Sequence, residues 1–156
     1  MSTRSATIIR QEQTRWRLGD DGRYEADGTE LKEVARFYRH CDGYPEGHGL
    51  HMAHSFANTD GAERADWFQK LLGPFMTGEG VKGTPFEDWG APTLEFEPPS
   101  ATHGDLEYLY CVTKRNKRVE IGVWAIGFDE RYEDVLARVP EFEGTPEDYI
   151  AWIGGC

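Results

Sequence analysis

Two stretches of alternating residues near the end of the chain most constrain its fold. "DLEYLYCVT" covers 105–113 and "RVEIGVWAI" covers 118–126, with only a short basic turn between them. Alternation of apolar and polar side chains is typical of strands that are buried on one face. Two such runs around a short polar turn predict a β-hairpin, and this hairpin requires an antiparallel sheet in the fold.

Other segments add strands and helices to this hairpin. Further strands are expected at 5–11, 33–40 and 93–97, and a second hairpin at 15–28 around Asp-Asp-Gly. Helices are expected at 45–56, 60–72, 129–139 and 145–153. Residues 73–104 form a long Gly/Pro-rich loop region. This order predicts a single α+β domain over 1–156, with an antiparallel sheet of about four to five strands and helices packed on one face.

The composition narrows the class of partner. The 156 residues fit one domain and carry a net charge of −11, and most of this net negative charge lies in the second half, which has 16 Asp/Glu against 7 Lys/Arg. Such a surface repels nucleic acid and attracts basic proteins. We see no secretory signal and no run of the roughly 20 apolar residues that a membrane span needs. Three cysteines without a CxxC pair suit a reducing compartment, so we expect a cytoplasmic protein without membrane contact.

The segment "FYRHCDGYPEGHGLHMAHSF", 37–56, is the most unusual part of the chain, and a metal site is one interpretation of it. His48, His51 and His54 recur every three residues, and zinc accepts histidine ligands. On a helix this spacing places the first and last histidine about 120° apart, which is poor for one tetrahedral site. Neither HExxH nor a CxxC knuckle is present. We therefore expect no cofactor and no metal, and keep a metal-dependent hydrolase as the least favoured alternative.

A catalytic interpretation has little support. Cys41 lies between His40 and Asp42, but adjacent residues of a strand point to opposite faces. No GxSxG, Walker or GxGxxG motif is present, so we predict no catalytic residue.

A structural interpretation explains the turn itself. The carboxylate of Asp42 can accept hydrogen bonds from the amides of the turn, Gly43 suits a positive φ, and Pro45 can open the following helix. The segment is then a strand-to-helix corner.

This corner resembles a known signature. "FYRHCDGYPEGHG" is similar to the Y-R-H-x-D-G-Y-P-x-x-x-G signature of small proteins encoded by bacteriophages and prophages, most of which have no assigned function. "DLEYLYCV" resembles a later hairpin of the same proteins. The resemblance implies a short strand before the signature and a helix after it, but no reaction. The matching positions are Tyr38, Arg39, His40, Asp42, Gly43, Tyr44, Pro45 and Gly49. The segment 12–32 and the acidic C-terminal helices look like additions to this pattern, so a specialised role is expected there.

Two functions from different classes follow. The first is a non-enzymatic acidic binding protein of phage or prophage origin that inhibits a host system, as an anti-CRISPR or other anti-defence protein. It would occupy a basic, nucleic-acid-binding surface of a host protein. Its contact residues would be Glu130, Glu133, Asp134, Glu141, Glu143, Glu147 and Asp148, together with Arg115 and Lys117 at the basic hairpin tip.

The alternative function is binding or sequestering of a small ligand such as a nucleotide. Arg39, His40 and Tyr44 of the corner would form this site together with the loop aromatics Phe86 and Trp89. Arginine and aromatic side chains suit phosphates and bases.

Overall fold

The structure is a computed structural model that describes residues 3–39, 42–57, 94–98, 100–115 and 118–155. The expected helix at 60–72 and most of the expected loop region 73–104 lie outside these residues. So do His40, Phe86, Trp89 and Lys117.

A six-stranded sheet organises the described residues, in the order β3-β2-β1-β4-β5-β6. All neighbouring strands are antiparallel except β1 and β4, which run parallel. The α+β class and the mostly antiparallel sheet that the sequence predicts are confirmed. The strands are β1 (Ser5–Leu18), β2 (Tyr24–Arg39), β3 (Leu94–Phe96), β4 (Tyr108–Arg115), β5 (Arg118–Ala125) and β6 (Phe142–Gly144).

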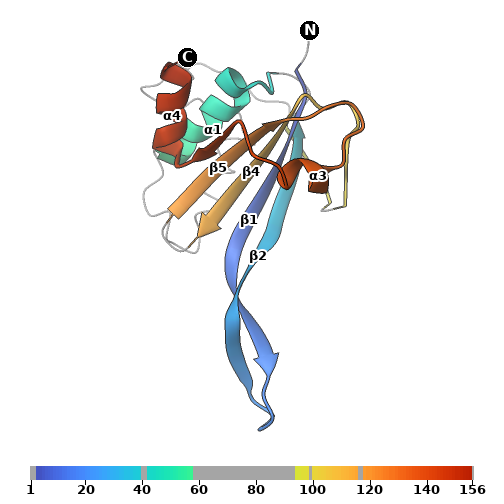
Figure 1. Cartoon of the computed structure of the whole chain (residues 1–156), viewed down its shortest axis with the longest axis vertical. Helices are drawn as coiled ribbons and strands as arrows, with labels where there is room; N and C mark the ends of the chain where they lie inside the picture. Colours follow the sequence, from blue (N-terminus) through green and yellow to red (C-terminus); the bar gives the residue numbers. More distant parts are fainter. Residues whose placement is uncertain (1–2, 40–41, 58–93, 99, 116–117, 156) are drawn as a thin grey trace.

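Strands β1 and β2 form one long hairpin rather than the separate short elements expected at 5–11, 15–28 and 33–40. The expected turn at Asp-Asp-Gly is present, with Gly22 at φ +79°. β1 pairs with β4 only as far as Gln11, so no other strand of the described residues lies beside the outer part of the hairpin. We call residues 12–31 the arm. Figure 1 shows the arm twisting away from the body of the sheet.

Helices lie on both faces of the sheet, not on one face as the sequence predicted, because β4 and β5 are apolar on both faces. α1 (Leu50–Ala57) and α4 (Pro146–Gly154) cover the face that carries Tyr110 and Val112. The short α3 (Tyr132–Leu136) covers the opposite face, which carries Leu109 and Cys111. α1 and α4 lie side by side at one end of the sheet, and α3 lies apart from them (Figure 1).

The C-terminal elements follow local signals. Thr145 caps α4 by accepting a hydrogen bond from the amide of Asp148 at 3.2 Å, and Pro146 opens the helix, as the sequence predicts. α3 is shorter than the expected helix at 129–139. None of the helices that the structure describes is both long enough and apolar enough to cross a membrane.

Candidate functional site

The corner after β2 is held by main-chain bonds. The amide of His48 donates to the carbonyl of Asp42 at 2.8 Å, and the amide of Gly43 donates to the carbonyl of Thr3 at 2.9 Å. Among the described residues the carboxylate of Asp42 has no hydrogen bond, so the expectation that it binds the turn amides is wrong. Asp42 itself has the positive φ, +57°, that we expected at Gly43. Aspartate tolerates this conformation better than most residues.

The glycine at position 43 is required for close approach instead. A Cβ there would lie 2.7 Å from Oγ of Ser5 and 2.9 Å from the carbonyl of Thr3. Pro45 opens a π-helix, η1 (Pro45–Gly49), which leads directly into α1. The strand-to-helix corner is therefore present. Asp42 provides its positive φ, and Gly43 allows the close approach of Ser5 and Thr3.

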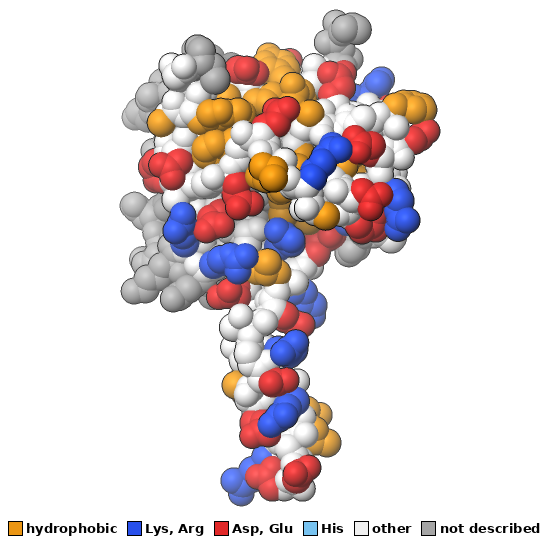
Figure 2. Space-filling model, in the orientation of Figure 1, with side chains coloured by type: hydrophobic (Ala, Val, Ile, Leu, Met, Phe, Trp, Pro, Cys, Tyr) orange, Lys and Arg blue, Asp and Glu red, His pale blue; other side chains and the backbone are white. Residues whose placement is uncertain are grey.

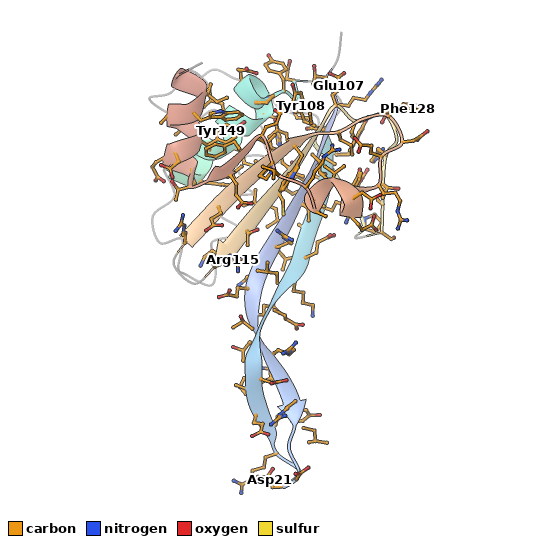
Figure 3. The ribbon with its side chains drawn as sticks, in the orientation of Figure 1. Asp21, Glu107, Tyr108, Arg115, Phe128 and Tyr149 are labelled. Carbon is orange, nitrogen blue, oxygen red and sulfur yellow. The ribbon has the colours of Figure 1, made fainter. Side chains whose placement is uncertain are left out.

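Two buried tyrosines from distant parts of the chain anchor this corner. The hydroxyl of Tyr110 donates to the carbonyl of Gly43, and that of Tyr149 donates to the carbonyl of Pro45, both at 2.8 Å. Burial raises the pKa of both hydroxyls, so both stay protonated as donors. Figure 3 labels Tyr149, which reaches the corner from α4. The hydroxyls have a structural role here because both are used by main-chain carbonyls.

His48 lies at the centre of the corner. One Arg39 nitrogen is 3.2 Å from Nδ1, and Oγ1 of Thr7 is 2.9 Å from Nε2. Arginine can only donate, so Nδ1 accepts, Nε2 carries the proton and the ring is neutral. Burial, the charge of Arg39 and the proximity of His51 hold the pKa of His48 well below its usual range. Both ring nitrogens are engaged within the protein, so this histidine has no lone pair available for a metal.

The other two histidines of the spacing are placed differently. His51 is buried beside His48, whereas His54 is only partly buried, and this partial burial lowers its pKa. His48 and His51 are 0% and 1% exposed, so neither lies on the surface. No group of three or more His, Cys, Asp or Glu side chains in the described part of the chain is arranged to hold a metal ion.

The residues of the small-ligand hypothesis are only partly placed. Arg39 is 3% exposed and donates to His48, and Tyr44 is 38% exposed. His40, Phe86 and Trp89 lie outside the described residues. The structure therefore brings none of these side chains together into a described pocket.

The acidic residues of the partner-binding hypothesis are on the surface but differ in their pairing. Glu130 accepts hydrogen bonds from Arg138, which lower its pKa, and Glu133 lies 3.6 Å from Arg131. The other five form no ion pair within the described residues. Four of these, which we call the acidic edge, lie close together in the sequence, from the residue before β6 to the first turn of α4: Glu141, Glu143, Glu147 and Asp148.

The basic tip of the β4–β5 hairpin is less uniform than expected. Arg115 is exposed and pairs with Glu12 at 3.2 Å, and Arg118 pairs with Glu120 at 3.1 Å. Lys114 is only 5% exposed, so it does not add to an exposed basic surface at the tip. Its position in β4, paired with β1 and β5, explains this burial.

The outer part of the arm has two different faces. Cross-strand pairing sets Trp16 opposite Ala26 and Leu18 opposite Tyr24, so these four side chains share one face. Trp16, Leu18 and Tyr24 are 61%, 62% and 72% exposed. We call this set the apolar strip.

The opposite face of the arm is charged and internally paired. Arg17 contacts Glu25 at 3.1 Å, and Arg15 contacts Asp27 at 3.7 Å. Figure 2 shows hydrophobic side chains on the outer arm beside these charged ones. In the sequence, apolar and charged residues alternate in "WRL", 16–18, and "YEA", 24–26. Only the pairing of β1 with β2 shows that the apolar residues of the two segments lie on the same face.

Comparison of the chain with models of protein families, with curated proteins and with solved structures finds no match.

Proposed function

We propose that this chain is a non-enzymatic protein-binding protein that holds its partner with the apolar strip of the arm. The observation that carries the proposal is the exposure of Trp16, Leu18 and Tyr24 on one face of an arm that projects from the body (Figure 1). Tryptophan and tyrosine are the side chains that most often dominate binding energy at protein interfaces. A strip of large apolar side chains that no part of the described fold covers marks a contact surface.

The arm is built so that the strip is not needed for the fold. The buried core takes Ile8 and Ile9 from β1 and Phe37 and Tyr38 from β2, all at the inner end of the hairpin. A two-stranded hairpin alone is only marginally stable. The paired charges on the opposite face support the hairpin and leave the apolar strip free for a partner.

The extent of the strip indicates a second contact. Its exposed side chains offer on the order of 400 Å² of apolar surface, judged from the size of such side chains. A specific interface buries about 800 Å² on each partner. We assign the second contact to the acidic edge, whose carboxylates have no cation beside them among the described residues. The partner is then a protein with a basic surface beside an apolar groove.

The resemblance to phage and prophage proteins extends this proposal. It implies a host protein or complex as the partner, and inhibition of an anti-phage defence system such as CRISPR as the consequence of binding.

The test places a photo-crosslinking residue on the strip. Benzoylphenylalanine at position 24 should form a covalent adduct with one protein of a host lysate, and the same residue at position 128 should not. Phe128 is an aromatic residue that is 81% exposed and lies on the body, away from the arm and from α4 (Figure 3), so it is a matched control for surface reactivity.

The captured protein is then purified, and its affinity is measured with variants. Trp16→Ser with Tyr24→Ser should weaken binding at least tenfold, and Phe128→Ser should leave it unchanged. Glu147→Gln with Asp148→Gln should slow association and flatten its salt dependence. Equal crosslinking from positions 24 and 128, or full affinity of the arm variant, would refute the proposal.

A further inference from the structure

A cleft opens on the face of the sheet that α3 covers, away from both the corner and the outer arm. Its volume is about 440 Å³, within the range of small-molecule sites. β1, β2, α3 and the segment 100–102 contribute its lining residues: Ile8, Arg10, Glu33, Arg36, Ser100, Thr102, Tyr132, Glu133 and Leu136.

Arg10 is the positively charged residue of this cleft that is not paired with a carboxylate of the described residues. Its guanidinium donates to Oγ1 of Thr113 at 3.3 Å, and its Nε is buried without a hydrogen-bond partner. Arg10 forms no ion pair with any described residue. A partly buried guanidinium in this state has lost hydration without gaining an anion, which is unfavourable.

The two carboxylates that line the cleft are already engaged. Glu33 accepts two hydrogen bonds from Arg36, at 2.7 and 3.2 Å, and Glu133 lies beside Arg131. Arg36 also donates to the carbonyl of Ala101 and stacks over the ring of Tyr132 at 5.3 Å. Neither carboxylate is therefore paired with Arg10, and when Arg131 is counted with the charged lining residues, one positive charge is left unbalanced among the described groups.

The other residues that line the cleft indicate which kind of molecule would carry the balancing negative charge. Ile8, Leu136 and the ring of Tyr132 provide apolar walls, and Ser100 and Thr102 provide hydroxyls. A phosphate chain carrying several negative charges would meet Glu33 and Glu133, so the lining disfavours nucleotides. A single carboxylate attached to an apolar body matches the charge and the walls together.

We propose that this cleft binds a small organic monocarboxylate, whose carboxylate pairs with Arg10 and whose apolar body lies against Ile8, Leu136 and Tyr132. The site is distinct from the arm and does not depend on the proposed protein-binding function.

The test uses hexanoate as the probe, at pH 7.5 and millimolar concentration, with the full chain. Calorimetry and thermal denaturation should show saturable binding and stabilisation by hexanoate. 1-Hexanol tests the need for the charge, and inorganic phosphate tests the need for the apolar body. Both should bind at least tenfold more weakly than hexanoate.

Two variants and one control locate the site. Arg10→Gln should lower hexanoate affinity at least tenfold. Arg4→Gln, which removes an arginine paired with Asp105 on the surface, should leave it unchanged. Glu133→Gln removes an exposed rim carboxylate, so it should keep the fold and strengthen binding about twofold or more. This variant tests the site even if Arg10→Gln does not fold.

The proposal is overturned by no saturable binding of hexanoate, by hexanol binding as tightly, or by tighter binding of phosphate. Unchanged affinity in Arg10→Gln, or weaker binding in Glu133→Gln, also overturns it.

Discussion

The corner gives the sharpest stability prediction, at Gly49 in the last position of η1. A Cβ added to this glycine would overlap the hydroxyl oxygen of Tyr149 and lie 2.8 Å from its Cζ and 2.9 Å from Cε1 of Tyr110. Both tyrosines are 0% exposed, so neither ring has space to retreat. Gly49→Ala should therefore displace Tyr149 and break its hydrogen bond to the carbonyl of Pro45.

The expected loss of stability has two parts. Forcing extra volume into a packed core costs about 1–3 kcal/mol. Leaving the buried hydroxyl of Tyr149 without its acceptor costs about 1–3 kcal/mol more. Together these predict a decrease of about 2–6 kcal/mol in the free energy of unfolding, against the roughly 5–15 kcal/mol typical of native proteins. Urea denaturation followed by circular dichroism measures it.

A control and a double mutant isolate the cause. Gly154→Ala adds the same methyl group near the end of α4, where nothing lies within 4 Å, and should change stability by less than about 1 kcal/mol. Tyr149→Phe removes the overlapped oxygen but leaves Cζ in place. Its combination with Gly49→Ala should be less destabilising than the sum of the single variants by at least about 1 kcal/mol. A wild-type midpoint for Gly49→Ala, or simple additivity, would refute this reasoning.

Four further predictions follow from the same geometry. Asp42→Gly should be about 1–2 kcal/mol more stable than Asp42→Ala by urea denaturation, because only glycine accepts φ +57° without strain; equal stability would contradict this. His48 stays neutral when folded but binds a proton when unfolded below about pH 6.5. The contribution of His48 to stability should thus be constant above that pH and fall by up to about 1.4 kcal/mol per pH unit below it, and His48→Gln should reduce the slope of urea midpoints from pH 7.5 to 5.5, leaving the part due to other groups such as His54. Arg115→Ser removes an exposed ion pair with Glu12 and should cost less than about 1 kcal/mol in the same assay; a larger loss would show that the pair stabilises the fold. Zinc measured by elemental analysis should be far below one ion per chain, since both nitrogens of His48 are occupied; stoichiometric zinc would disprove this.

Local signals predicted the elements whose causes are local. The hairpin at 105–126 follows from alternation, the turn at Gly22 from Asp-Asp-Gly, and the start of α4 from Thr145 and Pro146. Each of these patterns depends on residues a few positions apart, so the sequence alone contains the whole cause.

The corner was only half predictable because its partners are distant in the chain. Tyr110 and Tyr149 lie 67 and 104 residues from the carbonyls they bind. No periodicity connects such positions. Burial of His48 and Lys114 runs against the usual exposure of these residue types and becomes evident only once their neighbours are placed.

The hairpin at 15–28 was predicted, but its continuity with the strands at 5–11 and 33–40 and its apolar strip were not, for a reason that also bears on function. Between residues 12 and 31 charged side chains fill one face and separate the large apolar residues of the other, so neither strand reads as a buried element. Residues that stabilise the fold can be identified because they are buried in a core, and Ile9 is the last residue of β1 in the core. Trp16 and Tyr24 have no such role, and exposed aromatic side chains favour aggregation unless something covers them. Their presence on a projecting hairpin is therefore better explained by a partner than by the stability of this chain.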